Sequence, residues 1–318
     1  SAWATLAGSA AVAADWWRVS HATSATPRRP GGRHVAFLAW ALPPNTNAGV
    51  HRPLSFLRHG TPLGWRFSTF QGETPSNQAQ HGDELLAKLP NSVRRTVVPG
   101  ESRPVSWRLF PRIDGGFADA IAFARVALET LRNDPPDAVL ASGPPFHTFV
   151  AARWLARAFG VPLVLDYRDE WSECPFDFVS AGPDDRRWER DCLRDAAAVI
   201  FTTQSHRTHQ LQTFSELTPD RAHVVANGWE PEDFEPMPVE GSGPGPTTRD
   251  GGVTSRPLRL SHVGTLSGHT SPVAFLQRLD ELIAAEPGWR RSVVSSSPTT
   301  GSSGKAAANA WQTMAWAP

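Results

Sequence analysis

The sequence predicts an α/β protein built on a Rossmann-like, doubly wound parallel sheet that helices cover on both faces. From His34 onward, short β-rich runs alternate with loops and helix-like segments, which is typical of such a sheet. Several of these runs are continuously apolar, as strands buried on both faces require. A chain of 318 residues with 40% hydrophobic content is long enough for two domains.

Seven segments are predicted as strands, and six helices are expected between them. The strands are His34–Trp40, Trp65–Phe70, Arg95–Val98, Asp137–Ser142, Pro162–Tyr167, Ala197–Thr203 and Ala222–Ala226. The helices are Val50–His59, Asp83–Leu89, Phe117–Arg132, His147–Phe159, Asp185–Asp195 and Ser205–Phe214. Together they form a first domain over residues 34–228.

The regions outside this domain differ in composition. Residues 1–33 are apolar and alanine-rich at first, lack a basic leader and are interrupted by Asp15, so we predict neither a signal peptide nor a span. We assign them no function and expect a poorly ordered leader. Residues 229–257 are rich in Pro, Gly and acidic residues and predict a linker.

A second domain is expected to begin at residue 258 and to reach residue 290. Leu258–Val263 is predicted as a strand, followed by a glycine-containing loop and a helix that runs to about Ala285. Residues 291–318 contain no Asp or Glu and show neither helical nor strand periodicity. We interpret them as a non-homologous tail, so that the second domain is truncated.

Charge and cysteine content exclude several classes of function. Lys+Arg and Asp+Glu are both 31, so no net charge favours binding to nucleic acid or to a membrane. Cys174 and Cys192 are too few for a disulfide scaffold and lack the spacing of a zinc site. A reducing cytoplasm is therefore the expected location.

Ligands of an open parallel sheet bind beyond the carboxyl ends of the strands, where helix amino termini direct their N–H groups. In the first such loop, residues 41–50, Gly49 would let a phosphate or sugar approach the backbone, although a plain turn glycine explains it as well. In the second, residues 142–149, His147 falls in the first helical turn, where a neutral imidazole could bond hydroxyls. A cap or a surface histidine is the alternative.

The third loop, residues 166–173, places four carboxylates with Arg168 and Trp171 at the end of a buried strand. Charges at that density must pair or bind a ligand. A structural Arg168–Asp169 ion pair and a metal site are both open, but no second histidine or carboxylate pair has helpful spacing for a metal.

Five segments, in this order and separation, resemble the family-four glycosyltransferases, especially bacterial enzymes that build surface polysaccharides. They are PPNTNAGVHRPLSFLRHGTPLGW (43–65), DAVLASGPPFHTFVAARWLARAFGVPLVLDYRDEW (137–171), ERDCLRDAAAVIFTTQ (189–204), VVANGWEPEDF (224–234) and LRLSHVGTLSGHTSP (258–272). The resemblance implies a GT-B fold, in which the amino-terminal domain takes the acceptor and the carboxyl-terminal domain takes the nucleotide sugar.

The resemblance also implies roles for individual residues. His147 and Asp169 would be the catalytic residues, with His147 near the transferred sugar. Gly49, Arg168 and Asn227 would bind substrate, with Gly49 near the donor phosphates and Asn227 at the start of the segment that leads across the hinge. A sixth residue, Gly264, would bind the donor diphosphate.

Such enzymes are generally retaining and need no metal or cofactor, since the nucleotide sugar is itself a substrate. The leaving phosphate accepts the acceptor proton, so the protein mainly orients substrates and stabilises phosphate charge. The family's diphosphate-binding basic residue and its two glutamates eight positions apart are missing here, because the acidic residues end at Glu286. Impaired activity is therefore expected of this chain.

Two other functions stay open: a non-catalytic carbohydrate- or partner-binding remnant, and a sugar-nucleotide epimerase of the same two-domain architecture. The expected partners are a nucleotide sugar and a saccharide or lipid-linked acceptor, and no nucleic acid. A lipid-linked acceptor would bring the protein to the inner face of the membrane as a peripheral contact, although no concentrated basic amphipathic face is found.

Overall fold

The computed structural model describes most of the first 233 residues and three short segments beyond them. The described residues are 2–24, 33–74, 82–175, 179, 181–233, 258–261, 271–285 and 293–296. The chain divides into two compact units, Ser1–Glu230 and Pro231–Pro318. This division falls within a few residues of the linker boundary that the composition predicts.

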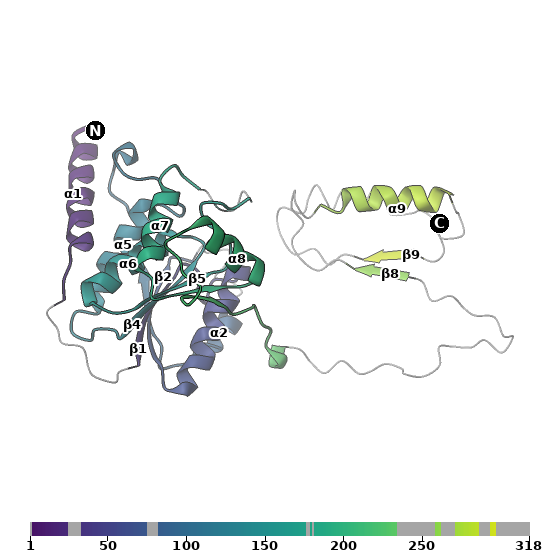
Figure 1. The fold of residues 1–318 in the computed structure, drawn as a ribbon, viewed down its shortest axis with the longest axis horizontal. Helices are drawn as coiled ribbons and strands as arrows, with labels where there is room; N and C mark the ends of the chain where they lie inside the picture. Colours follow the sequence, from purple (N-terminus) through teal and green to yellow (C-terminus); the bar gives the residue numbers. More distant parts are fainter. Residues whose placement is uncertain are drawn as a thin grey trace. The chain divides into compact units, whose positions relative to one another are not determined.

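The first unit is built on a seven-stranded sheet in which every pair of neighbouring strands is parallel (Figure 1). The strand order is β3-β2-β1-β4-β5-β6-β7, which is doubly wound with its switch point between β1 and β4. The strands are β1 His34–Ala39, β2 Arg66–Gly72, β3 Arg94–Val98, β4 Ala138–Gly143, β5 Leu163–Tyr167, β6 Ala198–Phe201 and β7 Ala222–Val224. The predicted α/β fold is confirmed.

Each of the six expected helices is also found. They are α2 His51–Gly60, α4 Asp83–Ala87, α5 Phe117–Thr130, α6 His147–Phe159, α7 Asp185–Asp195 and α8 Gln204–Thr213. Short 3-10 turns lie at η1 Ala48–Val50, η2 Thr61–Leu63, η3 Trp107–Leu109 and η4 Pro231–Asp233. No helix in the described ranges is both long enough and apolar enough to cross a membrane.

The two faces of the sheet bury separate cores, and β1 contributes to both because successive side chains of a strand point to opposite faces. Ala36 and Leu38 pack in the larger core with α5, α6 and α7. Val35 and Phe37 pack in the smaller core with α2. A strand buried on both faces must be apolar throughout, which explains the continuous run at residues 35–39.

The structure differs from the prediction at the start of the chain. Helix α1, Ala2–Ser20, is well formed where a poorly ordered leader was expected. Val12 and Val19 are buried, and Trp16 packs edge-on against Phe117 of α5 at 5.0 Å between ring centroids. An alanine-rich segment is a helix former, but most helical stability in proteins comes from packing against other elements, so it is packing against α5 that keeps α1 ordered.

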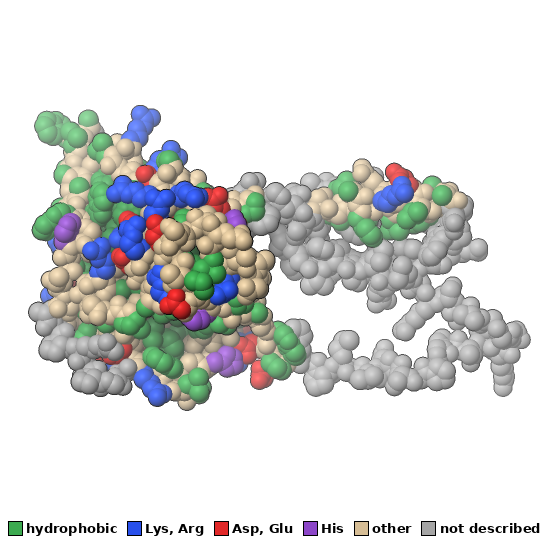
Figure 2. All heavy atoms as spheres, viewed as in Figure 1, with side chains coloured by type: hydrophobic (Ala, Val, Ile, Leu, Met, Phe, Trp, Pro, Cys, Tyr) green, Lys and Arg blue, Asp and Glu red, His purple; other side chains and the backbone are tan. Residues whose placement is uncertain are grey.

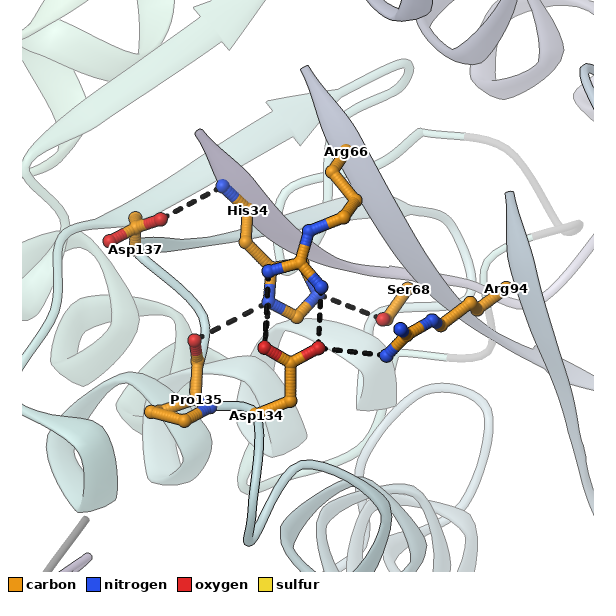
Figure 3. Close-up of polar contacts among 7 residues, drawn as sticks. All are labelled: His34, Arg66, Ser68, Arg94, Asp134, Pro135 and Asp137. Carbon is orange, nitrogen blue, oxygen red and sulfur yellow. Dashed lines mark hydrogen bonds and ion pairs between the residues drawn. The ribbon is translucent and has the colours of Figure 1, made fainter. Parts of the chain in front are cut away.

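A polar cluster joins the amino-terminal edge of the sheet to the loop before β4 (Figure 3). The carboxylate of Asp134 accepts bonds from Arg66 and, at 2.7 Å, from Arg94 Nη1, and these guanidinium groups hold its pKa at about 2. His34 Nε2 lies 2.8 Å from Ser68 Oγ, and its Nδ1 lies 3.3 Å from the Pro135 carbonyl. Each polar side chain named in this cluster has a hydrogen-bond partner, so we interpret the cluster as structural.

The second unit contains a β-α-β arrangement. Strands β8 Leu258–Ser261 and β9 Val293–Ser296 pair in parallel, and helix α9 Val273–Ala285 lies between them in sequence. The predicted strand and helix are found, although residues 262–270 lie outside the described residues. The strand β9 falls in the region expected to be an unrelated tail. The sequence did not reveal it because its two valines and two serines show no strand periodicity, and the strand is defined by its pairing with β8.

Helix α7 buries an acidic residue beneath the end of β5. Glu189 accepts hydrogen bonds from the Tyr167 hydroxyl at 3.3 Å, the Ser172 N–H at 3.0 Å and Gln210 Nε2 at 3.4 Å. All three donors are uncharged. Burial without a cation disfavours the carboxylate and raises the pKa of Glu189 to about 7 from its usual 4.5.

Replacing Glu189 with Gln is expected to change the pH dependence of stability. The protonated acid contributes stability that is full below pH 4.5 and is lost as the pH rises through 7, whereas a neutral amide keeps it. Glu189→Gln should match the parent near pH 4.5 and exceed its free energy of unfolding by about 3 kcal/mol at pH 8. Urea unfolding at both pH values tests this, with the exposed Glu129→Gln as control; a difference that does not grow with pH contradicts it.

Candidate functional site

The candidate site lies at the carboxyl-terminal edge of the sheet, where neighbouring parallel strands all end. The loop after β1 carries Gly49, α6 begins after β4 with His147, and Arg168 and Asp169 directly follow β5. Asn227 follows β7 at the same edge. The residues predicted for the first domain are therefore gathered at one end of the sheet.

Arg168 ties these loops together through backbone carbonyls. Its Nη1 donates to the Gly49 carbonyl at 2.9 Å, its Nε donates to the Gly143 carbonyl at 3.3 Å, and its Nη2 donates to the Pro144 carbonyl. Burial lowers the pKa of the guanidinium from its high usual value, and Asp166 and Asp169 oppose that shift. The Arg168–Asp169 ion pair, one of the alternatives left open by the sequence, is not found among the described residues, because carbonyls bind the guanidinium instead.

Gly49 serves a purpose that differs from the one expected. Its N–H group donates to Asn47 Oδ1 at 2.9 Å, so the N–H is already used within the loop rather than directed at a ligand. A Cβ atom at this position would overlap Arg168 Nη1. Glycine is therefore required so that the guanidinium can reach the Gly49 carbonyl.

His147 is fully buried, and neither ring nitrogen has a hydrogen-bond partner among the described residues. The ring packs edge-on against Trp40 at 5.1 Å and Phe123 at 5.2 Å between centroids. Burial lowers its pKa to about 3, so the imidazole is neutral at pH 7, as predicted, but through desolvation more than through the helix dipole. The alternative of a surface histidine is wrong.

A loop that the sequence did not single out covers His147. Gly115 and Gly116 have φ of 75° and 94°, which favour glycine, and a Cβ on Gly115 would overlap His147 Nδ1. Asp114 fixes the loop to α6, since its carboxylate accepts from Phe146 N–H at 2.9 Å and its carbonyl accepts from His147 N–H at 3.1 Å. In the sequence, the two adjacent glycines after Asp114 are the signal that could have indicated this loop.

Most carboxylates of the acidic loop after β5 lie beside a basic side chain. Glu170 lies 2.8 Å from His209 Nδ1, and Glu173 pairs with Arg186. Asp169 is half-buried, and burial raises the pKa of its carboxyl while Arg168 opposes the shift. The described residues contain no group of three His, Cys, Asp or Glu side chains placed to hold a metal ion.

Arg52 is a member of the site that sequence reasoning missed. From the first turn of α2 it bonds the buried Asp166 carboxylate through Nε at 2.9 Å and Nη2 at 2.8 Å. Its Nη1 donates to the Ala226 carbonyl and to Asn227 Oδ1, both at 3.2 Å. Asp166 also accepts from Ser142 Oγ at 2.8 Å. The predicted residue Asn227 is thus held against α2 rather than left open.

A family model for the glycosyl transferase 4-like domain matches residues 2–228, which include the complete seven-stranded sheet. The chain belongs to this family. The match confirms the family that the five sequence segments predicted. No match is found among curated proteins.

Solved structures with similarity to this glycosyl transferase 4-like chain are known. The N-terminal domain of trehalose-6-phosphate phosphatase from Candida albicans is 13% identical over 92% of this chain and 69% of that chain, with a TM-score of 0.50. A glycosyltransferase from Rickettsia africae ESF-5 (11% identity, 85% and 69%, TM-score 0.49) and MurG from Acinetobacter baumannii (13%, 86% and 68%, 0.43) are further matches. At such low identity the Candida likeness shows a common fold and says nothing of activity.

Within this glycosyl transferase 4-like domain, the structure brings Gly49, Arg168, Asp169 and Asn227 to one edge and buries the side chain of His147 behind it. Gly264, predicted for the donor phosphates, lies outside the described residues. The roles of these six residues stay predictions.

Adding a methyl group to Gly49 is expected to break the Arg168 contact. In Gly49→Ala the new Cβ displaces Nη1 from the Gly49 carbonyl, which should lower the free energy of unfolding by about 1–2 kcal/mol. Gly100→Ala is the matched control, since nothing lies within 4 Å of its Cβ position. Thermal unfolding of both variants measures the effect; equal stability of the two would show that Arg168 does not depend on Gly49.

Proposed function

We propose that this chain is a glycosyltransferase that moves a sugar from a nucleotide-sugar donor to a saccharide or lipid-linked acceptor with retention, in bacterial surface-polysaccharide synthesis. The observation that carries the proposal is the convergence of the loops after β1, β4 and β5 on Arg168 within a glycosyl transferase 4-like domain. The protein would work in the cytoplasm or at the inner face of the membrane.

The chemistry requires orientation more than a protein nucleophile. As the acceptor oxygen bonds to the anomeric carbon, the bond from that carbon to the leaving phosphate breaks, and the phosphate takes the acceptor proton on the same face of the sugar. A preorganised edge of dipoles and charges stabilises the developing phosphate charge. We assign Gly49 and Arg168 to the wall of this site, Asn227 to its rim and Gly264 to the donor phosphates.

Asp169 and His147 are proposed as the residues that act on the sugars. The half-buried Asp169 carboxylate is suited to accept a bond from a sugar hydroxyl. Each unpartnered buried nitrogen of His147 costs about 1–3 kcal/mol, which a sugar hydroxyl would recover if the loop of Gly115 moved aside. The histidine is then a group whose hydrogen bonds form only with substrate.

Replacing His147 with Phe separates this role from a packing role. Phenylalanine retains the ring contacts with Trp40 and Phe123 and removes both unpartnered nitrogens, so thermal stability should rise or stay equal. Transfer should fall roughly 100-fold because the sugar contact is lost. His206→Phe is the matched control, since His206 is also buried with an unpartnered Nε2 but lies on α8.

The full chain is assayed with single UDP- and GDP-sugars and a set of saccharide and lipid-linked acceptors, by nucleotide release, by mass of the product and by NMR of the new anomeric centre. A new glycoside with the donor's anomeric configuration supports the proposal. An altered nucleotide-linked sugar without a glycoside would establish an epimerase instead. Saccharide binding with no turnover would establish a binding protein.

A further inference from the structure

The outward face of α1 carries an apolar stripe of five residues, Trp3, Leu6, Ala10, Ala14 and Trp17, here called the α1 stripe. Trp3 is 82% exposed, Leu6 58% and Trp17 67%, and both alanines are exposed as well. The helix stands at the outer side of the first unit, and hydrophobic side chains are visible at its free end (Figures 1 and 2). A surface of this kind marks an interaction site.

The stripe contains no charge. Between Trp3 and Trp17 the only ionisable residue is Asp15, which lies on the inner face and is buried. The inner face is packed in the ordinary way through Val12 and Val19. A helix that is apolar on both faces is covered on both faces in the functional protein.

We propose that the α1 stripe binds the same stripe of a second copy of this chain, with the two helices antiparallel about a two-fold axis at Ala10. The stripe is symmetric about that position, since Trp3 and Trp17 lie seven residues on either side of Ala10. Trp3 of one copy then faces Trp17 of the other, and Leu6 faces Ala14. A large side chain thus meets a small one beside the axis, and Ala10 lets the two backbones approach closely.

The charges beside the helix favour a second copy over an anionic lipid surface. Arg18 pairs with Asp15 at 2.6 Å, and Arg103 pairs with Asp15 at 2.9 Å and with Glu101 at 2.5 Å. These cations are already neutralised by their own neighbours. Helices that lie on membranes carry free Lys and Arg along the rim of the apolar face, and α1 does not.

The area available is sufficient for a specific contact. A buried tryptophan supplies about 150–250 Å². Two indoles, a leucine and the alanines from each of two copies therefore bury roughly 1,000 Å² in total, which is the lower limit of a specific interface. The two indoles of a copy lie about 21 Å apart along the helix, so the contact is long enough to fix the orientation of the pair.

Sedimentation velocity on the full chain, over a range of concentrations, tests the proposal. The parent chain should form a dimer. Leu6→Glu and Ala14→Lys should each weaken the dimer roughly 100-fold, because each buries an unpaired charge. The double variant Leu6→Glu with Ala14→Lys should restore it, since the antiparallel pairing sets each new glutamate against a new lysine of the other copy.

Leu63→Glu, at a leucine in η2 that is at least as exposed as Leu6, is the matched control and should leave the dimer unchanged. Circular dichroism of every variant shows that α1 is retained. A monomeric parent chain overturns the proposal, and flotation of that monomer with vesicles of phosphatidylcholine and phosphatidylglycerol would assign the stripe to a membrane. A dimer that both single variants leave intact, or that the double variant fails to restore, also overturns it.

Discussion

The arrangement of the site depends on the guanidinium of Arg168. Its planar group offers five N–H donors, enough to bind carbonyls of two different loops at once while its own backbone stays in line with β5. A lysine has no such geometry. The half-buried charge lies close to Asp166 and Asp169, which partly balance it, although no ion pair among the described residues includes Arg168. One side chain thereby sets the distances among the loops that follow three central strands.

The second support of the same edge is the Arg52–Asp166 pair. It links α2, on one face of the sheet, to the end of β5 and to the segment that leaves β7. Glu230 continues that attachment, since its carboxylate lies 3.1 Å from both Ser55 Oγ and His59 Nε2 of α2. The chain is therefore held to α2 up to the point where the first unit ends.

The buried histidines at the two ends of the sheet differ in the hydrogen bonding of their ring nitrogens. At the amino end, each ring nitrogen of His34 has a hydrogen-bond partner in the cluster around Asp134, so we interpret this histidine as structural. At the carboxyl end, His147 is equally buried and has no partner among the described residues. Unsatisfied buried groups are rare because each is costly, so this contrast supports the proposal that the site lies at the carboxyl end.

The sequence by itself determined the seven strands of the large sheet and the six helices between them, and it predicted the edge where ligands would bind, because apolar runs, helical spacing and the parallel topology are local or nearly local signals. It also identified the family through five ordered segments, and the positions of Gly49, Arg168 and Asp169. Only the tertiary structure decided what those residues contact. Gly49 is explained by a guanidinium 119 positions away in the chain, and Arg52, the burial of His147 and the order of α1 likewise depend on partners distant in sequence, which no local pattern encodes.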